Sequence, residues 1–284
     1  MRTKPTGASG KKRPSVRQKE TRKNEMKKLM LSAALAATLA GFGIESANVV
    51  GYSTLSLGKG QFCIVGAQWK TCLNTPIGIN QLVKGDFVAV PLEKANVNEA
   101  TQLQVFDGSG YQYYYYVSDG WYDDGTPEWG QKEGWVDGTD CIVEDTLNPG
   151  AGFWFKDPNE ACNVQLAGQL VSEATYQVSA STGWNLISNP YPLALDLNEV
   201  TYSGIIASTL ESMATDAPQV QVFDGVGYQY YYYVSDGWYD DGTPEWGQKT
   251  GWVDGTECIV DTAIAPGKGF WFKATTATEI TFAK

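Results

Sequence analysis

The chain has 284 residues, of which 43% are hydrophobic and 13% aromatic, and it carries 32 acidic residues, 21 basic residues and no histidine. The absence of histidine excludes enzymes that use an imidazole base or a Ser-His-Asp triad, and it excludes histidine-ligated metal sites. The acidic excess disfavours nucleic acid as a partner, because the phosphate backbone is also negative.

The first 46 residues have the pattern of a leader. Residues 1–25 are basic and polar, and Met26 is followed by two lysines and an apolar run that ends near Gly43. This is the layout of a secretory signal peptide with a helical apolar segment. The run is shorter than the roughly 20 residues of a membrane-spanning helix. We expect translation to start at Met26, with a longer basic region as the alternative. We also expect the protein to be secreted to the cell surface or the medium, or held in the periplasm.

Without residues 1–46 the chain is strongly acidic. That segment holds 11 of the 21 Lys and Arg residues but only three acids, so residues 47–284 carry 10 lysines, no arginine and 29 acids. The formal net charge of this part is therefore −19 (10 minus 29). Such a charge favours solubility and attracts cations. We expect no transmembrane span and no nucleic-acid partner for it, and the oligomeric state stays open.

A 40-residue tract occurs twice, at a constant offset of 117 positions. Residues 104–143 and 221–260 differ only at Ser109/Val226, Glu133/Thr250 and Asp140/Glu257. Because a fixed internal period defines the folding unit, we expect two tandem domains of the same fold, residues 47–166 and 167–284.

Short apolar or aromatic runs bounded by Gly, Asp, Asn and Pro predict strands in both halves. Turn signals lie between them, for example at residues 106–111, 118–130 and 136–139. The pattern predicts an all-β protein with two antiparallel β-sandwich or partly open barrel domains. Helical patterns cover only residues 79–83, 197–200 and 207–213. The predicted strands are residues 61–67, 86–90, 103–107, 111–117, 141–143 and 152–156 in the first half, and 184–188, 204–207, 220–224, 258–260 and 269–273 in the second.

Part of the second half resembles a known module. GWNLISNP (183–190), the VQVFDG run, PGKGFWFK (266–273) and the final TEITF are similar to a β module that is widespread in secreted and surface proteins of bacteria. In the first half GQFCIVGAQW replaces the first motif, although PGAGFWFK (149–156) is kept. The resemblance implies a location and a β fold, with no defined activity.

All five cysteines follow the leader, and export would permit disulfides. We expect Cys63–Cys72 and Cys141–Cys162 pairs with Cys258 free. A Cys141–Cys258 bridge between the halves is the alternative, and an odd cysteine could also link two chains.

The candidate site consists of aromatic rings beside carboxylates in the repeated tract. Alternate tyrosines of a strand fall on opposite faces, so the structural interpretation places one face on the core and makes cross-strand ring contacts with the other. The binding interpretation uses the same rings for the flat C–H faces of sugars and the acids for sugar hydroxyls. The candidate ligand-binding residues are Trp121, Tyr122, Asp123, Asp124, Glu128, Trp129 and Trp135, with Trp238, Tyr239, Asp240, Asp241, Glu245, Trp246 and Trp252.

Calcium is the one cofactor that the tract suggests, because Ca²⁺ is bound by six to eight oxygen atoms. The spacing of the acids does not match an EF-hand loop, and no other cofactor is expected. The calcium candidates are Asp119, Asp123, Asp124, Asp236, Asp240 and Asp241.

The sequence therefore predicts a non-catalytic, secreted interaction protein that contacts an extracellular protein or matrix. The alternative is a pair of carbohydrate-binding modules. The enzyme alternative is a glycoside hydrolase with two catalytic carboxylates.

Overall fold

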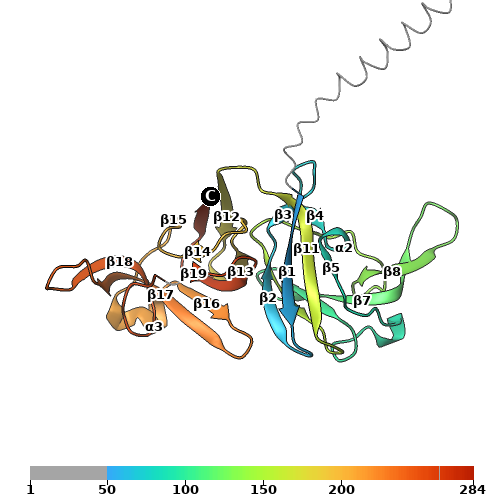
Figure 1. Ribbon diagram of the computed structural model, residues 1–284, viewed down its shortest axis with the longest axis horizontal. Coiled ribbons are helices and arrows are strands. Elements are labelled where there is room, and N and C mark those ends of the chain that lie inside the picture. The colour runs from blue at the N-terminus through green and yellow to red at the C-terminus, as the bar shows by residue number, and fades with distance from the viewer. Residues whose placement is uncertain (1–49, 262) are drawn as a thin grey trace, which may run out of the picture. The chain divides into compact units, whose positions relative to one another are not determined.

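The structure is a computed structural model that describes residues 50–261 and 263–284 (Figure 1). The expected leader, with its signal-peptide helix and its start at Met26, lies outside these residues. The chain is mostly β and its strands form several sheets, which confirms the all-β class. Within the described ranges, we find no helix with the length and apolar character needed to cross a membrane.

In the first half, two antiparallel sheets share one core. One sheet has the order β1-β11-β3, with β5 also paired to β11, and the other has the order β2-β10-β6-β7-β8. β4 and β9 form a small ribbon. The elements are β1 (Val50–Leu57), β2 (Phe62–Gly66), β3 (Trp69–Lys70), β4 (Ile77–Gly78), α2 (Ile79–Leu82), β5 (Val83–Gly85), the 3-10 helix η1 (Leu92–Lys94), β6 (Gln102–Phe106), β7 (Tyr111–Tyr122), β8 (Gly130–Val136), β9 (Thr146–Leu147), β10 (Gly152–Lys156) and β11 (Cys162–Leu170).

In the second half, the sheets have orders β12-β21-β15 and β13-β20-β16-β17-β18, with a β14-β19 ribbon. The five-stranded sheets of the two halves therefore match strand for strand. The elements are β12 (Thr175–Ala180), β13 (Gly183–Ser188), β14 (Leu195–Asp196), β15 (Thr201–Ser203), the 3-10 helix η2 (Leu210–Ser212), α3 (Met213–Asp216), β16 (Gln219–Phe223), β17 (Tyr228–Tyr239), β18 (Gly247–Val253), β19 (Ala263–Ile264), β20 (Gly269–Ala274) and β21 (Thr278–Ala283).

Each half has its own hydrophobic core between its sheets. Side chains alternate across a strand, so Phe153 and Phe155 of β10 enter the first core while Trp154, between them, faces away from it. Trp135 of β8 and its counterpart Trp252 of β18 are completely buried. Burying an aromatic side chain removes roughly 150–250 Å² from water, so these rings are major contributors to each core.

An asparagine fixes the position of each buried tryptophan. In α2, Asn80 Oδ1 accepts a hydrogen bond from Trp135 N at 2.8 Å, and its Nδ2 donates to Val143 O at 2.8 Å. In the second half, Asn198 accepts from Trp252 N at 2.8 Å and donates to the carbonyl of residue 260. Each asparagine thus satisfies main-chain groups that the strands leave without a ladder partner.

The three helical predictions have different outcomes. The prediction for residues 79–83 is confirmed by α2. The prediction for residues 197–200 is wrong: these residues form a turn, because Asn198 N donates to Asp196 Oδ1 at 2.8 Å. In residues 207–213, helical structure begins only at Leu210, with η2, and continues into α3.

Contacts between the two halves occur in matching pairs. The registers of β2–β10 and β13–β20 make Gly66 equivalent to Ser188. Gly66 N donates to Gly267 O at 2.8 Å, and Ser188 N donates to Gly150 O at 2.8 Å. Since Gly267 is the counterpart of Gly150, each of these two bonds is the counterpart of the other. Ring contacts follow the same rule: Trp154 packs on Phe223 with centroids 5.2 Å apart, and their counterparts Trp271 and Phe106 at 5.0 Å. The same patch of each half therefore contacts its equivalent, as in a two-fold symmetric interface.

The structure holds none of the expected disulfides, and its five cysteines are in the reduced form. The side chain of Cys63 enters the core from β2, whereas Cys72 is exposed in the turn after β3. The backbone of Cys141 forms an isolated β-bridge with β7, whereas Cys162 is the first residue of β11, on the opposite sheet. The Cys141–Cys258 alternative is not formed either. Closeness in the sequence does not predict which cysteines pair, because a short chain segment can cross from the core to the surface.

Candidate functional site: the twin aromatic hairpins

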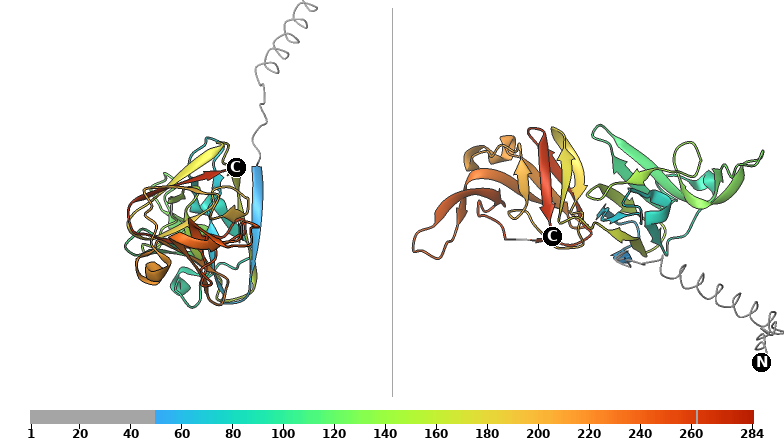
Figure 2. Two further views of the ribbon diagram at one scale, coloured as in Figure 1. Left: turned by 90° about the vertical axis from the view of Figure 1, so that its left-hand side faces the viewer. Right: turned by 90° about the horizontal axis from the view of Figure 1, so that it is seen from above.

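Each copy of the repeated tract forms a long hairpin, β7–β8 in the first half and β17–β18 in the second (Figures 1 and 2). Both hairpins have a register shift at the same place, between Val117 and Gly120 and between Val234 and Gly237. This β-bulge lets each strand continue beyond the Asp–Gly pair to Tyr122 or Tyr239. The views show the hairpin ends projecting away from the rest of each half.

The tyrosine run divides its rings between two faces. Tyr114 is buried, and Tyr116 packs against the first core. Tyr111 and Tyr113 are exposed on the other face, and their ring centroids lie 6.3 Å apart. In the second half Tyr230 is exposed and Tyr228 is half-buried, and their ring centroids are also 6.3 Å apart. One face of the run is therefore structural and the other is an aromatic surface.

Two tryptophans of each hairpin are open to solvent. The exposed fraction is 40% for Trp121 and 56% for Trp129, and it is 38% and 57% for their counterparts Trp238 and Trp246. The main chain of Trp121 is held on both sides, because its N–H donates to Asp140 O at 3.1 Å and its carbonyl accepts from Ile142 N at 2.7 Å. A rigid backbone thus carries an exposed indole.

Trp135 and Trp252 have to be removed from the binding candidates. Both indoles are 0% exposed and lie in the cores, where a ligand on the surface cannot touch them. The sequence alone does not distinguish the buried tryptophan from the exposed ones, because Trp121, Trp129 and Trp135 all lie among aromatic and acidic residues.

Tyr122 and Tyr239 pack within their own hairpins. A Cβ on Gly130, which pairs with Tyr122, would meet that ring at 2.8 Å. Lys132 Nζ lies 4.4 Å from the centre of the Tyr122 ring, and Lys249 Nζ lies 5.0 Å from that of Tyr239. These cation–π contacts were missed in the sequence, because lysine and tyrosine meet only across the hairpin.

The hairpin tips are shaped by aspartates. Asp123 Oδ1 accepts from Gly125 N at 2.8 Å, and Asp124 Oδ1 accepts from Thr126 N at 3.0 Å. The Thr126 hydroxyl also donates to Asp124, and these two bonds hold the pKa of that carboxyl below its usual value. Asp240 and Asp241 make the corresponding main-chain bonds at the second tip. Glu128 and Glu245 are exposed, and at the second tip the Thr243 hydroxyl donates to the Glu245 carbonyl at 2.7 Å.

The six calcium candidates all act as acceptors for main-chain N–H groups. Besides the four tip residues, Asp119 accepts from Leu92 N and Asp236 accepts from Leu210 N, each at 2.8 Å, at the starts of η1 and η2. Within the residues that the structure describes, no group of three or more acidic, cysteine or histidine side chains is placed to hold a metal ion. The Asp spacing that suggested calcium is also the spacing of aspartate turns.

The second hairpin borders a hollow of about 350 Å³ that the sequence did not indicate. It is lined by Gln229, Tyr230, Tyr231, Asp254 and Gly255. It places polar groups next to the exposed tyrosine face of the second half.

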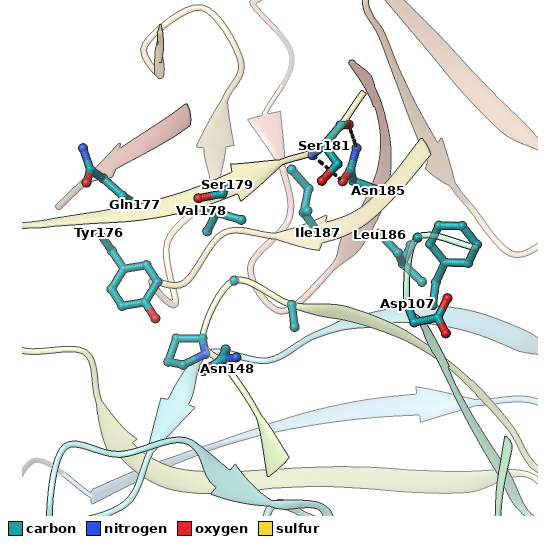
Figure 3. Close-up of a pocket in the computed structure, with 15 residues that line it drawn as sticks. Asp107, Asn148, Tyr176, Gln177, Val178, Ser179, Ser181, Asn185, Leu186 and Ile187 are labelled. Atoms are coloured by element: carbon teal, nitrogen blue, oxygen red, sulfur yellow. Dashed lines mark hydrogen bonds between the residues drawn. The ribbon is translucent and has the colours of Figure 1, made fainter. Parts of the chain in front are cut away.

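A cavity of about 400 Å³ lies where the two halves meet, away from the hairpin tips (Figure 3). Asp107 and Asn185 line it, and both already use their polar atoms within the protein. Asp107 accepts from Gly110 N at 2.8 Å, and Asn185 exchanges two hydrogen bonds with the main chain of Ser181. The junction cavity therefore presents fewer free polar groups than its lining suggests.

No protein-family model, curated protein or solved structure that was compared with the chain matches it. The resemblance of residues 183–190 and 266–273 to a bacterial β module accordingly stays a prediction.

Proposed function

We propose that this chain is a secreted or surface-attached, non-catalytic binding protein whose twin hairpins contact an extracellular protein or matrix. In this proposal it consists of two tandem β-sandwich domains of the same fold behind a cleaved signal peptide. We place the boundary after Leu170, because β11 pairs with β1 beyond the expected boundary at residues 166/167. The acidic charge makes nucleic acid an unfavourable partner.

The observation that carries the proposal is the equal exposure of corresponding indoles. Trp129 and Trp246 differ by one percentage point in exposed fraction, and Trp121 and Trp238 by two. Aromatic side chains that are held open to water on an ordered backbone cost little entropy when they bind, and they are enriched at binding interfaces. Two copies on one chain would raise the avidity for a repetitive partner.

Carbohydrate is the second candidate ligand, and the hairpin tips favour it. Each tip combines an exposed indole with acidic side chains, here Trp129 with Asp123, Asp124 and Glu128. An indole face can cover the C–H face of a sugar ring, while free carboxylate oxygens accept hydrogen bonds from sugar hydroxyls.

An array that carries both glycans and extracellular matrix proteins tests the proposal. The chain is compared with a Trp121→Ala/Trp238→Ala variant and with a Trp129→Ala/Trp246→Ala variant. Tyr52→Ala is the matched control, because Tyr52 is an exposed aromatic residue outside the tract.

We expect both double variants to lose binding and the control to keep it. Binding confined to glycan spots would favour the carbohydrate candidate over the protein one. Release of reducing sugar from a bound glycan would contradict the non-catalytic assignment, and equal binding by all variants would remove the hairpins from the function.

A further inference from the structure

Two buried cysteines enter the first core from opposite sheets, and they lie at the same end of that core. Cys63 is the second residue of β2, and Cys162 is the first residue of β11. The connections that precede them, residues 58–61 and 157–161, both cross from one sheet to the other. These connections are tied together, since Gly60 N donates to Asp157 O at 2.6 Å.

The register shows that both side chains point inward. Cys63 pairs with Phe155 of β10, and Cys162 pairs with Leu57 of β1. All four side chains belong to the same buried cluster, in which Cys63 is 6% and Cys162 is 4% exposed. The Cys63 thiol contributes to the raised pKa of Cys162, so the two thiols lie close together in the core, although they are 99 positions apart in the sequence.

The second half lacks both cysteines at the equivalent places. Phe272 is the counterpart of Phe155, and it pairs with Asn185, which therefore replaces Cys63. Ala180 takes the place of Leu57 and pairs with Thr278, which replaces Cys162. The thiols thus occur together in one half and are both replaced in the other, as expected if they act as a pair.

We propose that Cys63 and Cys162 form a disulfide that joins the two sheets of the first half. The oxidant is another disulfide, either a small molecule or an oxidoreductase of the exporting compartment. One cysteine thiolate attacks this disulfide and forms a mixed disulfide, which releases one thiolate. The second cysteine then attacks the protein sulfur of the mixed disulfide and releases the other thiolate. Two protons pass to the two leaving groups, so the protein is oxidised by two electrons and the reagent is reduced by two.

The surroundings of the thiols indicate when the bond forms. Burial raises the pKa of Cys63 to about 12, against a weaker opposing effect of Lys268. Burial, with Asp157 and Asp86 adding to it, raises the pKa of Cys162 to about 12. Because only the thiolate reacts, the exchange takes place while the core is still open. Once formed, the bond is shielded from reductants.

Tryptic digestion under non-reducing conditions tests the proposal directly. Cleavage after lysine places the five cysteines on five different peptides: residues 60–70, 71–84, 133–156, 157–249 and 250–268. The full chain is refolded with reduced and oxidised glutathione, its remaining thiols are alkylated, and it is digested. We expect mass spectrometry to find peptide 60–70 linked to 157–249, and dithiothreitol to abolish the linked species.

Stability gives the second readout. We expect oxidised protein to unfold at a urea midpoint roughly 1–2 M above that of reduced protein, from typical disulfide stabilisation and urea dependence. Cys63→Ala should abolish this redox shift, whereas Cys141→Ser/Cys258→Ser should retain it. A chain with free thiols in both peptides, or with either peptide linked to a different cysteine, would overturn the proposal. A redox shift that persists in Cys63→Ala would overturn it as well.

Discussion

Two tryptophans that are close in the repeated tract have opposite environments, one exposed to solvent and one in the core. Trp129 ends a solvent-exposed hairpin tip, and Trp135, six positions later, is completely buried. The difference arises from the strand between them, which passes from the projecting part of the hairpin into the sandwich. Substitutions at the two positions should therefore separate binding from stability.

Replacing Trp135 by alanine should destabilise the chain by about 3–5 kcal/mol, because it empties a large volume in the core. Replacing Trp129 by alanine should change the unfolding free energy by less than about 0.5 kcal/mol, as is usual at the surface. Urea titrations followed by circular dichroism measure both changes. Similar losses for the two variants would contradict the assignment of core and surface.

Asn80→Ala should lower the unfolding free energy by about 1–3 kcal/mol, because it leaves Trp135 N and Val143 O without the hydrogen-bond partners described above. Asn198→Ala should have a similar effect in the second half. The matched control is Asn98→Ala on the exposed surface. Thermal unfolding measures the shift, and a midpoint for Asn80→Ala equal to that of the control would show that the bonds contribute nothing.

At the scale of elements, a polar contact ties the segment between β11 and β12 to the first half. Lys70 Nζ, on β3, donates to Glu173 Oε1 at 2.9 Å. The Glu173 main-chain N–H and then Lys70 hold the pKa of the Glu173 carboxyl down to about 2, from an ordinary 4.5. Because the folded-state pKa is the lower one, the contact stabilises the fold fully above pH 4.5 and is lost as pH falls toward 2.

We expect Glu173→Gln to have a lower unfolding free energy than wild type at pH 6. This difference in unfolding free energy should disappear between about pH 4.5 and pH 2. The exposure of the carboxylate keeps the gap small. Unfolding free energies measured across this range test the sign. A gap that widens toward low pH would contradict the assigned shift.

The aromatic strands are easier to predict from the sequence than the alternating ones. The runs around Phe153 and Tyr114 were recognised, whereas β1 and β12 were not, because their apolar residues alternate with Ser, Thr and Gln. The Asp–Gly pair at residues 119–120 was expected in a turn, but it lies in the bulge of β7. A Cβ at Gly120 would meet Val136 and Ile142 at 2.6 Å, so glycine is needed there for close packing. Such contacts depend on distant strands, and a local pattern cannot show them.

At the scale of the whole described chain, the two halves join through equivalent patches. Gly269 of β20 lies at this joint, where an added Cβ would be 2.5 Å from Ile64 Cγ2 and 2.9 Å from Val65 O. Close packing of backbones therefore requires glycine. The joint couples the two cores, and we expect them to unfold in one transition.

Gly269→Ala should uncouple the halves and split the calorimetric transition into two. Gly110→Ala is the matched control, since its Cβ would meet nothing within 4 Å. A single transition in Gly269→Ala, as in the control, would show that the close packing at Gly269 is not what couples the two cores.

We propose that the four exposed indoles of the two hairpins form the contact surface. The most direct measurement is the binding of a variant with Trp121, Trp129, Trp238 and Trp246 all replaced by alanine to an array of glycans and extracellular matrix proteins. We expect this variant to lose every array signal of the wild type, while circular dichroism shows an intact β fold. Wild-type binding by the folded variant would contradict it.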